Sequence, residues 1–111
     1  MTYEQYIRGV QRPYADGPLL KLLLQRMQAS GLTQREIAND LGYDKPNILT
    51  MFVRGETQIP IDRAIRLGDI LGIDLVELIE KGAETYPENA AWKAGRTIIR
   101  RLRPPEPLPV A

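Results

Sequence analysis

The chain has 111 residues, a net charge of +1, and neither cysteine nor histidine. This length predicts one domain with a modest core, and the missing residue types exclude disulfides, thiolate nucleophiles and histidine-based metal or acid–base chemistry. No phosphate-binding glycine loop, dinucleotide motif or HExxH pattern occurs either. We therefore expect no enzyme, no cofactor and no metal.

Charge is unevenly distributed along the chain. Residues 61–90 carry seven acidic and three basic side chains, whereas residues 91–111 carry five basic and one acidic. An acidic side turned away from DNA and basic ends turned toward it suit a nucleic-acid binder, and head-to-tail association is the alternative. The N-terminus lacks the apolar core of a signal peptide, and no apolar run approaches membrane-spanning length, so a cytoplasmic protein with no membrane partner is expected.

Two stretches precede the most informative part of the sequence. Residues 1–17 have no strong period and are interpreted as an N-terminal arm with Arg8 and Arg12 available for phosphates, or as a mobile terminus. Residues 18–30 have helical spacing, with Pro18 in the first turn and Gly31 after the end. The residues expected to form an inward stripe are Leu20, Leu23, Leu24 and Met27. Two more leucines, Leu19 and Leu22, widen this stripe enough to predict a second contact surface.

Residues 33–51 predict two short helices joined by a tight turn. Thr33 and Glu36 have the spacing of a capping box, Ala38 is small where the helices would cross, and Gly42 can end the first helix with φ > 0. Asp44 is expected to cap the second helix, with Pro46 in its first turn. The apolar side chains expected to pack inward are Ile37, Leu41, Tyr43, Ile48 and Met51.

Two further helices follow a glycine-containing loop. Residues 61–71 form one with Ala64, Ile65, Gly68 and Leu71 at helical spacing, and Gly72 ends it. Asp74 caps the next, which Gly82 is expected to end. Its inward residues are Leu75, Leu78 and Ile79.

The pair of short helices resembles the helix-turn-helix of the phage repressor and Cro-like (XRE-type) DNA-binding family. The resemblance covers about residues 18–81. It implies an all-α fold with a five-helix lambda-repressor-like domain over residues 18–82.

The C-terminal region lies outside that minimal domain. Residues 83–103 are expected to hold an amphipathic helix from Pro87 to Leu102, for dimerisation or accessory DNA contact, followed by an extended proline-rich tail over residues 104–111. One face is basic, with Lys93, Arg96, Arg100 and Arg103. The apolar residues predicted to contact a second copy are Trp92, Ile98, Ile99 and Leu102.

The resemblance also implies which residues contact DNA. The second helix of the motif, residues 44–54, reads the major groove in this family. Lys45 can donate to guanine, Asn47 can pair with adenine or hold a phosphate, and Thr50 can touch a thymine methyl, with Leu49 beside them. Gln34 corresponds to a phosphate-binding glutamine. The complete predicted set is Thr33, Gln34, Arg35, Asp44, Lys45, Pro46, Asn47, Thr50, Arg54 and Gln58.

Three features depart from the family pattern. Asp44 places a carboxylate near the reading edge, Pro46 removes a side-chain hydrogen bond, and Gly55 comes one residue later than usual. The function implied is that of a dimeric, sequence-specific repressor of phage, prophage or mobile-element type that binds a double-stranded DNA operator. The alternative is a protein-interaction module, antitoxin-like or an adaptor, that keeps the fold without reading DNA.

Overall fold

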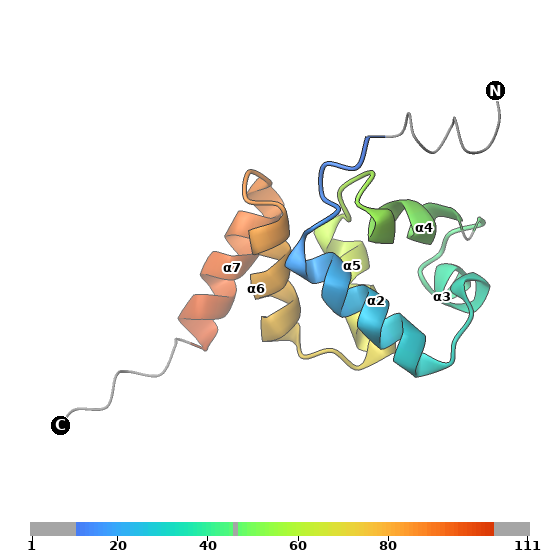
Figure 1. The fold of residues 1–111 in the computed structure, drawn as a ribbon. Helices are drawn as coiled ribbons and strands as arrows, with labels where there is room; N and C mark the ends of the chain where they lie inside the picture. Colours follow the sequence, from blue (N-terminus) through green and yellow to red (C-terminus); the bar gives the residue numbers. More distant parts are fainter. Residues whose placement is uncertain (1–10, 46, 104–111) are drawn as a thin grey trace.

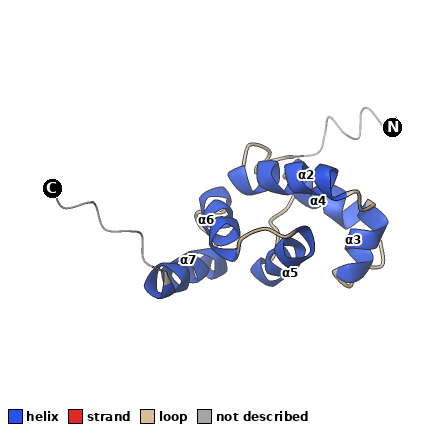
Figure 2. Cartoon of the chain, turned by 90° about the horizontal axis from the view of Figure 1, so that it is seen from below, coloured by secondary structure: helices blue, strands red, loops and turns tan. Residues whose placement is uncertain are grey.

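The computed structural model describes residues 11–45 and 47–103, and it folds them into helices joined by short loops, with no strand among them (Figures 1 and 2). The predicted all-α fold is thereby confirmed. The first ten residues of the arm with Arg8, the predicted base contact Pro46 and the tail over residues 104–111 lie outside the described residues. The helices are α2 (Pro18–Ser30), α3 (Gln34–Asp40), α4 (Asn47–Arg54), α5 (Ile61–Leu71), α6 (Leu75–Thr85) and α7 (Ala90–Leu102).

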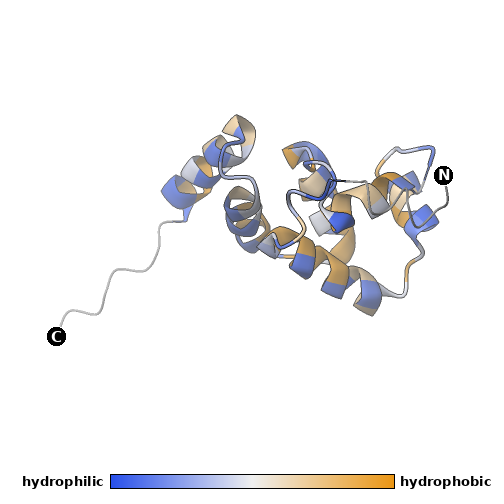
Figure 3. Ribbon diagram, turned by 45° about the horizontal axis from the view of Figure 1, so that its top comes forward, coloured by the Kyte–Doolittle hydropathy of each residue, from blue (hydrophilic) through white to orange (hydrophobic). Residues whose placement is uncertain are grey.

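Helix α2 packs on several other helices. It contacts α4 and α5 and packs most extensively on α6 (Figure 1). Leu19 and Leu22 are buried with Leu20 and Leu23, so the predicted second contact surface exists and is used within the chain. Leu24, predicted to face inward, is instead 40% exposed. In Figure 3 most helices carry both hydrophobic and hydrophilic residues, as amphipathic helices around one core do.

Helix α6 is longer than the sequence predicts. Asp74 caps it as expected, its carboxylate accepting from the Glu77 N–H. Gly82 does not end it, because the helix continues to Thr85. A Cβ at Gly82 would overlap the ring of Trp92, so this glycine makes room for α7. Leu75, predicted to face inward, is 46% exposed in the first turn.

Helix α7 begins at Ala90 rather than at Pro87. The Asn89 side chain accepts from the Trp92 N–H at 3.1 Å and sets this start as an N-cap. Trp92 is fully buried against α6, which corrects its predicted place on a dimerisation surface. The predicted boundary between residues 82 and 83 falls inside α6, and α7 packs on that helix, so it belongs to the same core.

A buried aromatic group joins α6 and α7 to the loop after α4. The Trp92 indole N–H donates to the Ile59 carbonyl at 3.0 Å, and the Tyr86 hydroxyl accepts from the Ile59 N–H at 3.2 Å. Tyr14 packs edge-on against Tyr86, with ring centres 5.0 Å apart. Burial raises the pKa of Tyr86 to about 12. This aromatic group thus holds both the backbone N–H and the backbone carbonyl of Ile59.

Part of the basic face of α7 is paired with α6. Arg100 makes two hydrogen bonds to the Glu80 carboxylate, at 2.8 and 2.9 Å, and they hold the pKa of Glu80 below its ordinary value. Arg103 lies 3.7 Å from Asp74. Some of the basic residues after residue 90 thus pair with acidic residues of the 61–90 stretch within the same chain. Among the described helices, none is long and apolar enough to cross a membrane.

Candidate nucleic-acid interface

The first helix of the motif, α3, begins as its sequence predicts. The Thr33 hydroxyl accepts from the Glu36 N–H at 3.1 Å, and the Thr33 N–H donates to the Glu36 carboxylate at 3.0 Å. This capping box satisfies two backbone N–H donors, those of Thr33 and Glu36, that would otherwise need water. Thr33, Gln34 and Arg35 are all exposed. The Thr33 hydroxyl is used to start the helix, which leaves Gln34 and Arg35 as the outward side chains of this end.

The connection between α3 and α4 is longer than a three- or four-residue turn, because α3 ends at Asp40 and the described part of α4 begins at Asn47. Gly42 has φ +84, and the Tyr43 N–H returns to the Ala38 carbonyl at 2.9 Å. Arg63 of α5 donates to the Leu41 carbonyl and lies over the Tyr43 ring, 5.0 Å from its centre. The turn is thus held from below by α5.

The inward face of α4 is shifted by one residue from the predicted one. Leu49, Phe52 and Val53 are buried, and Ile48 is only partly buried. Met51, predicted to pack inward, is 37% exposed, and Leu49, predicted to lie beside the groove, is 0% exposed. Packing of Leu49, Phe52 and Val53 in the core sets this face. Gly55, with φ +81, ends the helix three residues after Phe52.

The outward face of α4 follows from the positions of its buried residues. At 3.6 residues per turn, Asn47, Met51 and Arg54 lie opposite the buried face, with Thr50 at its flank. Asn47 and Met51 are exposed, as are Asp44 and Lys45 before the helix, whereas Thr50 and Arg54 are half-buried. Sequence reasoning missed Met51. No local signal identifies it, because Ile48 with Met51 has the same helical spacing as Leu49 with Phe52.

Gln34 and Thr50 join the two helices of the motif. The Thr50 hydroxyl donates to the Gln34 side-chain oxygen at 3.0 Å. Because the Gln34 oxygen already accepts from the Thr50 hydroxyl, the Gln34 NH₂ group is the end suited to donate to an anion. The predicted pair of DNA contacts is therefore brought together at the exposed edge between α3 and α4.

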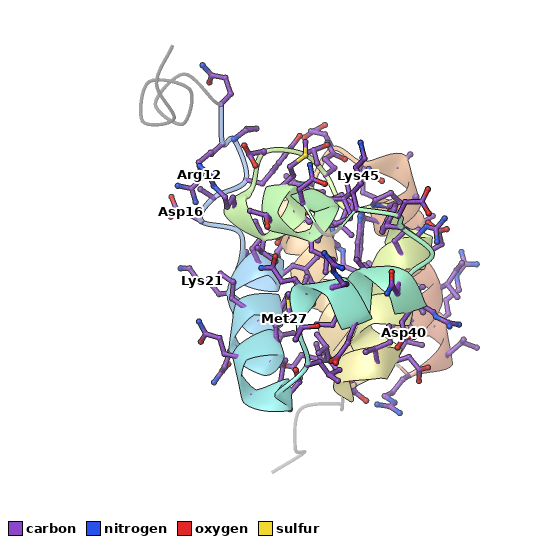
Figure 4. All side chains as sticks on the ribbon, turned by 90° about the vertical axis from the view of Figure 1, so that its right-hand side faces the viewer. Arg12, Asp16, Lys21, Met27, Asp40 and Lys45 are labelled. Atoms are coloured by element: carbon purple, nitrogen blue, oxygen red, sulfur yellow. The ribbon has the colours of Figure 1, made fainter. Side chains whose placement is uncertain are left out.

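Arg12 lies beside the C-terminal end of α4. Its Nε donates to the Arg54 carbonyl at 2.7 Å, and the Tyr14 N–H donates to the Gly55 carbonyl at 3.1 Å. Figure 4 shows Arg12 and Lys45 on opposite sides of α4 at the same edge of the molecule. Residues 11–17 are thus docked on the domain, unlike the predicted mobile arm, and they place a guanidinium next to Arg54.

Gln58 has a structural position instead of the predicted phosphate contact. Its NH₂ group donates to the Tyr14 hydroxyl at 2.8 Å, and its oxygen accepts from the Asn89 side chain at 2.6 Å. Both ends of the amide are therefore used to join residues 11–17, the loop after α4 and the start of α7. We assign Gln58 to the support of the interface.

These features define a helix-turn-helix module that exposes one face of its second helix. The helix-turn-helix family model of the XRE/Cro type matches residues 23–78, from α2 into α6, and the chain belongs to this family of DNA-binding regulators. Comparison with curated proteins and with solved structures found no match.

Proposed function

We propose that this protein is a sequence-specific regulator of transcription that places α4 in the major groove of double-stranded DNA. The observation that carries the proposal is the two-sided character of α4. Leu49, Phe52 and Val53 hold one face in the core, while Asn47 and Met51 are exposed on the other. A helix held in this way can enter the groove without losing its packing.

The groups around α4 divide into two kinds of contact. Lys45 and Asn47, at the start of the helix, carry donors that suit guanine and adenine edges, and Asp44 can accept from a cytosine amino group. Gln34 with Thr50 beside the middle of α4, and Arg12 with Arg54 at its C-terminal end, suit phosphates along the groove. Arg35 is a further exposed cation. Contacts at these separate points would fix how far the helix enters.

We further propose that the regulator acts as a homodimer, because one such module spans only a few base pairs. Ile98 and Leu102 on α7 are 54% and 79% exposed, and Ile99 is partly buried beside them. With Trp92 buried, these three residues are the part of the predicted dimerisation surface that is still available to a second copy. The family resemblance favours a repressor of phage, prophage or mobile-element type that acts in the cytoplasm.

A second function is favoured by an apolar hollow that none of the α4 residues lines. Ile65 and Leu75 are exposed at a hollow of about 450 Å³ between α5 and α6. The charged residues that line it are Asp62, Arg66 and Asp69. A partly apolar surface with more acidic than basic groups suits a protein partner better than DNA. An antitoxin-like or adaptor module is therefore the alternative.

Selection of bound sequences from random duplex DNA distinguishes these functions. We expect an enriched palindrome with half-sites about 10 base pairs apart, because a symmetric dimer repeats its contacts after one helical turn. An enriched single half-site would overturn the dimer alone. If no sequence is enriched, the DNA-reading function is wrong and the interaction module is the better account.

A further inference from the structure

We propose that the hollow between Tyr43, Ile48 and Met51 receives the 5-methyl group of a thymine in the major groove. The inference rests on the proposed function and deepens it, because it names a chemical group that α4 recognises. The hollow has a volume of about 310 Å³ and is continuous with the exposed face of α4. The residues that line it are Tyr43, Asp44, Lys45, Asn47, Ile48 and Met51.

The apolar part of this hollow is unusual for its position. A residue on the outward face of a DNA-reading helix is commonly polar, yet Met51 is 37% exposed there, one turn after Asn47. The thioether is flexible and polarisable, so it can adapt to a small apolar group. Of the atoms that bases present in the major groove, the thymine methyl is the apolar one.

The other walls are held by the fold. Tyr43 packs edge-on against the buried Phe52, with ring centres 6.1 Å apart, and Arg63 covers the Tyr43 ring from α5. Ile48 packs against the core. Two walls are thus fixed before DNA binds, and Met51 supplies the adaptable third wall.

The polar rim favours a base edge over a phosphate. The Asp44 carboxylate would repel a phosphate but can accept from the amino group of a neighbouring base. A thymine presents its O4 acceptor beside its methyl group, and the Lys45 ammonium or the Asn47 NH₂ group can donate to that oxygen. Methyl in the hollow and O4 at the rim together specify thymine.

The test uses the duplex that the full-length protein selects, with each thymine replaced in turn by uracil, which lacks only the methyl group. Loss of one buried methyl corresponds to about a three- to fivefold change in affinity. We expect a loss of this size at one position of each half-site. The same uracil substitution should cost clearly less in Met51→Ala, which lacks the third wall of the hollow and whose circular dichroism verifies that it is folded.

Leu24→Ala is the matched control, because Leu24 is 40% exposed on α2 and lies outside the hollow. It should keep the full sensitivity to uracil. The assignment is overturned if uracil is tolerated at every position, if the loss is undiminished in Met51→Ala, or if only 5-methylcytosine in place of cytosine changes the affinity. Those outcomes leave the DNA-reading function standing, whereas failure of the wild-type protein to bind any duplex overturns both.

Discussion

Replacement of Trp92 by alanine is expected to lower the free energy of unfolding by about 3–5 kcal/mol. The ring is 0% exposed, lies against Gly82 of α6 and packs near Tyr86, with ring centres 5.8 Å apart. Its loss leaves a cavity between α6 and α7 and removes the donor to the Ile59 carbonyl. Chemical denaturation followed by circular dichroism measures the change.

Two variants separate the contributions at Trp92. Trp92→Phe keeps most of the packing but leaves the Ile59 carbonyl without its partner, and should cost about 1–3 kcal/mol. Leu102→Ala, at a 79% exposed position of the same helix, should change stability by less than about 0.5 kcal/mol in the monomer. Equal effects of Trp92→Ala and Leu102→Ala would contradict the burial of Trp92 in the domain core.

Gly55→Ala should have the second large effect, because this glycine meets two requirements at once. Its φ is +81, which costs a residue with a Cβ about 1–2 kcal/mol. The new Cβ would also overlap the backbone of Tyr14 and Ala15. Residues 11–17 must therefore move away from the end of α4, carrying Arg12 with them, and we expect a loss of stability of about 2–4 kcal/mol.

Gly72→Ala is the control for the backbone conformation. Gly72 has φ +69 and nothing within 4 Å of its added Cβ, so this variant has only the cost of the left-handed conformation. The excess loss in Gly55→Ala then measures the docking of residues 11–17. Limited proteolysis should cut that segment faster in Gly55→Ala alone. If the two variants lose the same stability and are cut alike, the segment is not docked in solution.

The parts of the fold that sequence predicts are those set by local chemistry. The capping box of Thr33 and Glu36 lies within one turn, and so do the Asp74 cap and the glycine that ends α5. Each depends on side chain and backbone groups three or four residues apart. Such features need no knowledge of the rest of the chain.

The face of α4 could not be predicted in the same way. Ile48 with Met51 and Leu49 with Phe52 both have the spacing of a buried stripe, so the spacing alone does not choose between them. Packing of Leu49 and Phe52 in the core decides it. The predicted set of DNA contacts therefore omitted Met51, and Leu49 was wrongly predicted to lie beside those contacts.

Long-range packing accounts for the remaining differences. Gly82 has the sequence context of a helix end, but it lies inside α6 because Trp92 packs on it. Gln58 was predicted to contact a phosphate, but both ends of its amide form hydrogen bonds within the chain. Its partners, Tyr14 and Asn89, are 44 and 31 residues away in the sequence. No local pattern reports contacts across such separations.

The salt dependence of binding to the selected duplex tests the central claim, that this domain holds DNA through phosphates around α4. We expect the logarithm of the affinity to fall linearly with the logarithm of salt concentration, by a slope of about 0.9 per phosphate contacted. Arg12→Ala should make the slope shallower by about one contact, whereas Arg66→Ala on α5 should leave it unchanged. An affinity that does not respond to salt, or equal slopes for wild type and Arg12→Ala, would contradict the account.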